Sequence, residues 1–172
     1  MKRILILLAI GVVLISISIL WFGTITIQPQ PIPFKQSEFY KTDYQSTNYL
    51  LINVWSVGTK TLLEENPELK TTIESKNIHY ITFSTYKDST KLATKLKNNL
   101  VLKTYDKTLK NFASRDAILQ KIGLDGINNS DDLIKLNVVK TPYTALIKNK
   151  KILKFVYGYD FNTIKTWMDS IN

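Results

Sequence analysis

The residues whose side chains could best support a reaction lie in one short stretch, residues 59–62, which read Thr-Lys-Thr-Leu. A threonine hydroxyl becomes a nucleophile only beside a base, and His79, the one histidine of the chain, is the plausible base near neutral pH. An enzyme using Thr59 and Lys60 would therefore need His79 or a carboxylate within about 3–4 Å of Thr59. The chain contains no cysteine, so a lone strand histidine cannot complete a metal site, and His79 is predicted to be structural.

The same hydroxyls have a simpler structural interpretation. Residues 49–55 form an almost continuous run of bulky apolar side chains, which is typical of a strand buried on both faces. A Ser-Val-Gly break follows, and Thr61 with Glu64 three residues later has the form of a capping box. This pattern predicts a strand that leads into a helix, with the hydroxyls of Thr59 and Thr61 as helix caps.

This stretch resembles the active-site segment of the thioredoxin family, and most closely its membrane-anchored, TlpA-like thiol–disulfide branch. In that branch a buried strand ends in Asn-Phe-Trp, and Cys-x-x-Cys then opens a helix that a proline interrupts. Here residues 53–55 read Asn-Val-Trp, and Pro67 falls where the family's helix is kinked. The degenerate active-site positions are Thr59, Lys60, Thr61 and Leu62. The first and last of them stand where the two redox cysteines would be, so the resemblance implies the family's frame without its redox chemistry.

The rest of the chain predicts an α/β domain with a central mixed sheet flanked by helices, the thioredoxin-like fold. Alternation predicts a strand at residues 78–83 and a hairpin formed by residues 143–147 and 152–157. A closing helix is expected from about residue 162. A further helix, residues 88–99, is expected to bury one face, made of Leu92, Leu96 and Leu100.

The middle of the chain departs from the family pattern. Residues 115–122 predict a helix that ends at Gly123, and part of the region 101–127 looks like an insertion. A short helix is expected at residues 132–138. Residues 34–48 give only a weak signal, for an edge strand or a short helix.

A Thr-Pro step precedes the predicted hairpin, at Thr141 and Pro142. In thioredoxin folds this peptide bond is cis, faces the redox pair and offers backbone groups to an extended substrate, and the resemblance implies the same here. The partner-binding groove expected from the resemblance consists of Trp55, Gly58, Thr59, Thr141 and Pro142.

The N-terminus predicts a membrane anchor in residues 1–23. Lys2 and Arg3 precede 19 uncharged residues, 4–22, which as a helix would span about 28 Å, enough to cross the hydrocarbon layer. A cleaved signal peptide is the alternative, but bulky residues at 21–25 offer no small-x-small cleavage site. The basic start favours a single-pass chain in the inner membrane, with its N-terminus cytoplasmic and its C-terminal domain in the periplasm or its equivalent.

A spacer follows the anchor, in residues 24–34, which contain three of the five prolines. Such spacing favours an extended stalk, with a polyproline ligand for a partner as the alternative. The thioredoxin-like domain is expected at residues 35–172. The net charge is +9, but the lysines are scattered along the chain, so nucleic acid is not predicted as a ligand. The sequence also shows no motif for a metal or an organic cofactor, and none is predicted.

Three functions are compatible with these features. The first is a membrane-tethered, extracytoplasmic domain without redox activity that binds a protein partner as a scaffold or holdase. The second is a single-pass structural subunit of an envelope assembly for secretion, conjugation or respiration. The third is an enzyme with new chemistry at Thr59 and Lys60. Exposed apolar surface at the predicted groove favours the first, and exposed apolar surface elsewhere favours the second.

Overall fold

The structure is a computed structural model that describes residues 30–46, 48–129 and 141–171. The predicted anchor and the predicted helix at residues 132–138 lie outside the described residues. Within the described ranges, no helix is long and apolar enough to span a membrane.

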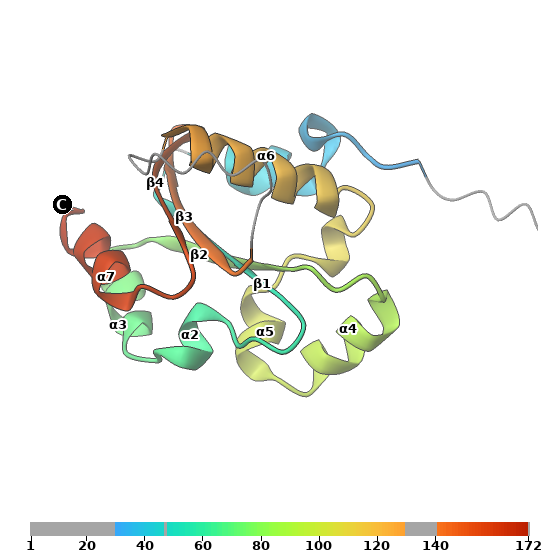
Figure 1. Cartoon of the computed structure of the whole chain (residues 1–172), viewed down its shortest axis with the longest axis horizontal. Coiled ribbons are helices and arrows are strands. Elements are labelled where there is room, and N and C mark those ends of the chain that lie inside the picture. The colour runs from blue at the N-terminus through green and yellow to red at the C-terminus, as the bar shows by residue number, and fades with distance from the viewer. Residues whose placement is uncertain (1–29, 47, 130–140, 172) are drawn as a thin grey trace, which may run out of the picture. The chain divides into compact units, whose positions relative to one another are not determined.

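Four strands and six α-helices are described, together with three short helical turns of other types (Figure 1). The strands are β1 (Leu50–Trp55), β2 (His79–Ser84), β3 (Tyr143–Lys148) and β4 (Lys151–Tyr157). The helices are α2 (Leu62–Glu65), α3 (Leu69–Ser75), α4 (Ser89–Lys97), α5 (Leu100–Tyr105), α6 (Arg115–Asn129) and α7 (Phe161–Asp169). The turns are η1 (Phe34–Gln36), η2 (Tyr40–Tyr44) and η3 (Leu109–Asn111). The predicted core strands, hairpin and closing helix are confirmed.

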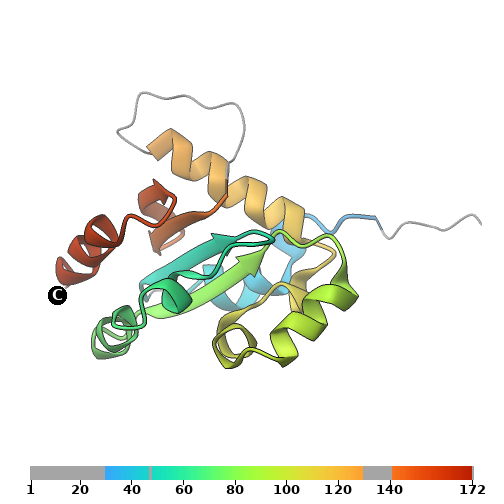
Figure 2. The ribbon, with the colours of Figure 1, turned by 60° about the horizontal axis from the view of Figure 1, so that its bottom comes forward.

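The strands form one mixed sheet in the order β2-β1-β3-β4. β1 and β2 are parallel, whereas β3 runs antiparallel to both of its neighbours, β1 and β4. A strand–helix–strand unit thus supplies half of the sheet, and a hairpin followed by a helix supplies the other half (Figures 1 and 2). This is the thioredoxin-like arrangement that the sequence predicts.

Helices cover both faces of the sheet, with α6 on one side and α2, α3 and α7 on the other (Figure 2). Alternate residues of each strand point to opposite faces, so each strand contributes to both cores. The core beneath α6, η1 and η2 includes Phe39, Ile52, Phe83 and Ile118. The core beneath α2, α3 and α7 includes Leu51, Leu63, Tyr80 and Trp167.

The domain makes its own core. Residues Pro31–Asn172 form a compact unit, and the buried members of its three apolar clusters all come from residues 39–171. Because the described residues of this unit bury three apolar clusters among themselves, we expect residues 31–172 to fold as a separate domain.

The expected continuous helix at residues 88–99 is wrong at its C-terminal end. α4 stops at Lys97, and Asn99 caps a new helix, α5, by accepting a hydrogen bond from Leu102 N at 3.1 Å. Leu100 is therefore not on the inner face of α4. It opens α5 and is 79 % exposed.

The expected end of a helix at Gly123 is also wrong, because α6 continues through Gly123 and Gly126 to Asn129. The reason for glycine at position 126 is close packing and not termination. A Cβ atom there would lie 2.0 Å from Cδ2 of Phe155 on β4, so only glycine lets α6 approach this ring.

Replacing Gly126 with alanine should lower the free energy of unfolding. Alanine favours a helix over glycine by about 1 kcal/mol, but forcing an extra carbon into a packed contact costs about 1–3 kcal/mol. Urea denaturation of residues 31–172 measures the balance. In a Phe155→Leu background the same substitution should become neutral or stabilising. Stabilisation by Gly126→Ala in the wild-type background would show that the contact with Phe155 does not limit the packing of α6.

Candidate functional site

A tight turn follows β1, where the sequence resemblance leads us to expect the counterpart of the family's dithiol. Gly58 has a φ of +86°, which a residue with a side chain adopts only with strain, and Thr59 N donates to Ser56 O at 3.1 Å. The Thr59 hydroxyl donates to Ser56 O at 2.9 Å and accepts from Ser56 N at 2.9 Å. Thr59 thus closes the turn on itself, so the prediction that its hydroxyl caps the helix is wrong.

The helix after the turn begins where the sequence predicts. Thr61 is its N-cap, and the capping box with Glu64 is complete: Glu64 N donates to Thr61 Oγ1, and Thr61 N donates to Glu64 Oε2 at 2.7 Å. Leu62, which the resemblance aligns with the family's second cysteine, is fully buried. α2 ends at Glu65 and α3 begins at Leu69, so Pro67 does interrupt the helical segment.

Asn53 connects the turn to the sheet. Its side chain is completely buried, and its Oδ1 accepts a hydrogen bond from Leu62 N at 3.0 Å. Its Nδ2 donates to the carbonyl oxygen of Tyr143 at 3.3 Å and to the hydroxyl of Thr144 at 3.2 Å. One amide side chain therefore fixes the start of α2 against β3.

Asn53 belongs to a buried polar row that crosses three strands. The strand register places it between Thr82 on β2 and Thr144 on β3, and all three side chains are fully buried. Sequence analysis did not identify this row. The available signal was a single polar residue inside each of three apolar strands, at positions that become neighbours only once the register is known.

The end of β4 returns to the turn through Tyr159, whose hydroxyl donates to the carbonyl oxygen of Lys60. Burial raises the pKa of Tyr159, and hydrogen bonding to Thr59 lowers it by less, so the pKa is about 12. The hydroxyl therefore stays protonated and remains a donor at neutral pH. Its neighbour Gly158 donates from its backbone N–H to Pro142 O at 2.9 Å. The peptide bond between Thr141 and Pro142 is cis, as the resemblance implies.

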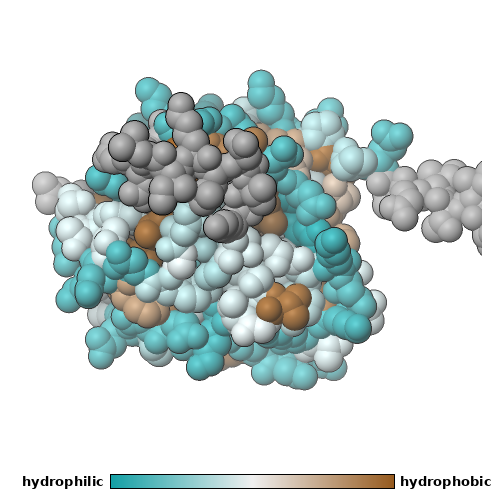
Figure 3. All heavy atoms as spheres, viewed as in Figure 1, coloured by the Kyte–Doolittle hydropathy of each residue, from teal (hydrophilic) through white to brown (hydrophobic). Residues whose placement is uncertain are grey.

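These bonds connect the turn, the end of β4 and the cis-proline into one surface, which we call the turn–proline surface. We define it as Val57, Gly58, Lys60, Thr141, Pro142 and Tyr159: hydrogen bonds link Tyr159 to Lys60 and Gly158 to Pro142, and the other members adjoin these residues in the chain. Val57, in the turn after β1, is 63 % exposed. Other hydrophobic residues are scattered on the face shown in Figure 3, which is largely hydrophilic.

Trp55 does not line this surface, which corrects the predicted groove. Its side chain is fully buried against α4 and α5, in a small cluster with Leu92, Leu96 and Leu102. The indole Nε1 donates to Asp106 Oδ2 at 2.9 Å. Burial raises the pKa of Asp106 more than its hydrogen bonds to Thr108, Trp55 and Thr82 lower it. Trp55 is thus an anchor for the α4–α5 layer, and its ring is not available to a partner.

His79 lies far from the turn. It is the first residue of β2 and pairs in register with Leu50, the first residue of β1, whereas Thr59 follows the last residue of β1. Five residues of strand separate the two ends, a distance of about 16 Å. His79 Nε2 lies 2.8 Å from Asp43 Oδ1 and ties β2 to η2, so it is not the base that an enzyme at Thr59 would need.

Among the described residues, no group of three histidine, cysteine, aspartate or glutamate side chains that could hold a metal ion includes His79 and Asp43. The carboxylate nevertheless depends on its neighbours. Burial raises the pKa of Asp43, but hydrogen bonds from His79 and Thr42 and the charge of Lys107 together lower it below its ordinary value. This contact is therefore a structural attachment of η2.

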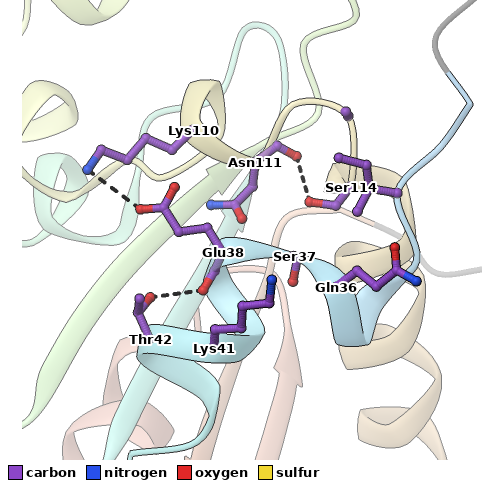
Figure 4. Close-up of a pocket in the computed structure, with 10 residues that line it drawn as sticks. Gln36, Ser37, Glu38, Lys41, Thr42, Lys110, Asn111 and Ser114 are labelled. Carbon is purple, nitrogen blue, oxygen red and sulfur yellow. Dashed lines mark hydrogen bonds and ion pairs between the residues drawn. The ribbon is translucent and has the colours of Figure 1, made fainter.

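A polar hollow of about 370 Å³ lies between the η1–η2 segment and the residues around η3 (Figure 4). Its polar groups bond within the wall: Asn111 Oδ1 accepts from Phe39 N at 2.9 Å, and the Ser114 hydroxyl donates to Asn111 O at 3.1 Å. Lys110 and Glu38 face each other across the rim at 3.8 Å. The bonds of Phe39 and Glu38 attach the η1–η2 segment to the residues around η3, and we assign no ligand site there.

No protein-family profile matches the chain, and no curated protein matches it. Several solved structures resemble it. A candidate thioredoxin from Neisseria meningitidis is 19 % identical, with a TM-score of 0.46, over 76 % of this chain and 78 % of that chain. The thioredoxin domain of a thiol-disulfide oxidoreductase from Bacteroides vulgatus is 18 % identical, with a TM-score of 0.44, over 76 % and 83 %. A thiol-disulfide oxidoreductase from Bacteroides fragilis is 17 % identical, with a TM-score of 0.42, over 77 % and 87 %.

Proposed function

We propose that this protein is a membrane-anchored, extracytoplasmic domain that binds an extended segment of a protein partner, as a scaffold or holdase, without redox chemistry. The partner would lie on the turn–proline surface. The observation that carries the proposal is a closed turn with an exposed apolar tip: the Thr59 hydroxyl donates a hydrogen bond to Ser56 O, while Val57 is 63 % exposed.

The absence of thiol chemistry follows from the residue types. Disulfide exchange needs an attacking thiolate and a second sulfur that resolves the mixed disulfide, and the chain has no cysteine. Thr59 supplies a hydroxyl that closes the turn, and Leu62 supplies a buried apolar side chain, at the positions where the resemblance expects the two sulfurs. The frame therefore holds together by capping, packing and hydrogen bonds at the point where the family carries out its chemistry.

Binding of an extended chain suits the elements that remain. In this proposal the Thr141–Pro142 segment would offer backbone groups to an extended chain, and apolar side chains beside it would receive side chains of the partner. Tyr159 and Phe161 add a stacked aromatic pair at the end of β4, with ring centroids 6.0 Å apart. Both rings are half-buried and pack against the core beneath α2, α3 and α7.

The proposed location rests on the sequence. Nineteen uncharged residues between Arg3 and Gly23 have the length of a membrane span, and the basic start favours a cytoplasmic N-terminus. With this orientation the domain would lie outside the cytoplasm, and a proline-rich spacer of about 3.1 Å per residue would keep it within a few nanometres of the membrane.

Photocrosslinking in cells tests the partner-binding role. A photoreactive amino acid at Val57 of the full chain should give adducts with another protein, because this side chain would contact the partner. The matched control is Leu153 on β4, which is 44 % exposed and lies outside the turn–proline surface. Equal adducts at both positions, or none at Val57, would contradict the proposed binding surface.

A structural role in an envelope assembly is the second candidate. It is favoured by Leu100, which is 79 % exposed, more than Val57, and which is not part of the turn–proline surface. Leu100 lines a hollow together with Leu63, Val101 and Tyr105, and a contiguous apolar patch of this kind is a candidate contact surface.

A further inference from the structure

Four lysines gather on the hairpin at one edge of the sheet. They are Lys148 at the end of β3, Lys150 in the turn, and Lys151 and Lys154 on β4. Lys148 is paired directly with Lys151 across the two strands, and Lys154 is paired with Leu146, two residues before Lys148. Paired residues of neighbouring strands, and alternate residues of one strand, point to the same face of a sheet. The strand register therefore places Lys148, Lys151 and Lys154 on one face, and we call these three residues and Lys150 the hairpin lysines.

The charges of the hairpin lysines are not compensated within the described part of the domain. Lys150, Lys151 and Lys154 are exposed, and Lys148 is half-buried, with its ammonium nitrogen 4.0 Å from the centre of the Tyr49 ring. None of the four forms an ion pair with a described carboxylate. Like charges directly opposite each other on neighbouring strands destabilise a sheet, so the pairing of Lys148 with Lys151 costs folding free energy. An anion outside the domain would offset that cost.

The residue types favour an extended anionic surface over a single anionic group. All four cations are lysines, which act as hydrated point charges on flexible stems, and the hairpin has no arginine to bind one phosphate or carboxylate bidentately. Leu153, next to Lys154, is 44 % exposed and adds an apolar side chain to the patch. Basic side chains attract the headgroups of an anionic membrane, and an apolar side chain beside them can enter the boundary with the acyl chains.

A strand of another protein fits this edge less well. β4 is an edge strand, and its pairing with β3 shifts register between Leu146 and Ile147, where Leu153 has no partner. Bulges and lysines are features by which natural proteins prevent strand addition at the edge of a sheet. β4 is therefore poorly suited to pair with another strand, while its lysine side chains stay accessible.

We infer that the hairpin lysines bind the headgroups of an anionic membrane. The inference concerns the surface of the domain itself, so it depends neither on an anchor in residues 4–22 nor on the turn–proline surface. It adds an orientation to the proposed function. The hairpin turn lies at one end of β3 and the cis-proline at the other, about 20 Å apart. A domain bound through the hairpin thus keeps the turn–proline surface away from the bilayer and open to a partner.

Acetylation resolved by lysine tests the inference on the full chain. The chain is placed in nanodiscs of neutral phosphatidylcholine, or of phosphatidylcholine mixed with anionic phosphatidylglycerol, and is treated briefly with an acetylating reagent. Mass spectrometry then measures the labelling of each lysine. Lys87, Lys97 and Lys103 are the matched controls, because they are also exposed and lie in or next to α4 and α5, at the opposite, β2 edge of the sheet. Co-purification of the chain with the neutral nanodiscs reports the anchor separately.

We expect Lys150, Lys151 and Lys154 to be labelled at least about fivefold less in the anionic nanodiscs than in the neutral ones, the factor that about 1 kcal/mol of attraction produces. The control lysines should change by less than about twofold, and salt at about 1 M should remove the protection. Equal labelling of the hairpin lysines in the two kinds of nanodisc would overturn the inference and would leave an acidic protein as the ligand of the patch. Equal protection of the control lysines, or protection by inorganic phosphate in neutral nanodiscs, would overturn it too.

Discussion

Replacing Asn53 with alanine should lower the free energy of unfolding by about 3 kcal/mol, a large share of the stability of a domain of this size. The substitution removes the acceptor of Leu62 N and the donor to Tyr143 O, and both groups lie in the dry interior. A buried polar group without a partner costs about 1–3 kcal/mol, so the loss exceeds that of an ordinary hydrogen bond.

Urea denaturation of residues 31–172 measures this loss. Asn98→Ala is the control, since Asn98 is exposed and does not lie in the polar row. If Asn53→Ala costs no more than the control, the amide of Asn53 is not what holds the start of α2 against β3. The same variant should also lose crosslinking at Val57, because the turn that carries Val57 would no longer be fixed to the sheet.

Local features of this domain were predictable from the sequence because they are made by residues close together in the chain. The capping box joins Thr61 to Glu64 within one helical turn, and the hairpin joins two alternating strands across a short loop. The interruption at Pro67 likewise depends on a single residue that cannot donate a backbone hydrogen bond. Strand order followed from the resemblance to thioredoxin and not from these patterns.

Features that depend on distant neighbours were missed or wrong. Trp55 stands at the end of an apolar strand, and the sequence does not tell whether its ring lines a groove or is buried. The positions of α4 and α5 decide that the ring is buried and bonded to Asp106. The helix was expected to end at Gly123, and the packing role of Gly126 becomes visible only when the ring of Phe155, 29 residues away, is placed against it. The exposure of Leu100 depends in the same way on the break at Asn99.

The central claim is that a thioredoxin-like frame binds unfolded or extended protein here and does no thiol chemistry. These two activities have opposite effects on insulin treated with dithiothreitol. A dithiol catalyst speeds reduction of the insulin disulfides, so the freed chains precipitate earlier. A domain that only binds extended chains holds the reduced chains in solution, so precipitation begins later.

The most direct measurement is therefore the lag before turbidity of insulin with dithiothreitol, in the presence of an equimolar amount of residues 31–172. We predict a longer lag than in buffer, and a lag that returns to the buffer value for Val57→Asp but not for Leu153→Asp. An authentic thioredoxin, which shortens the lag, shows that the assay detects redox catalysis. A lag shortened by the wild-type domain, or one that it leaves unchanged, would contradict the central claim.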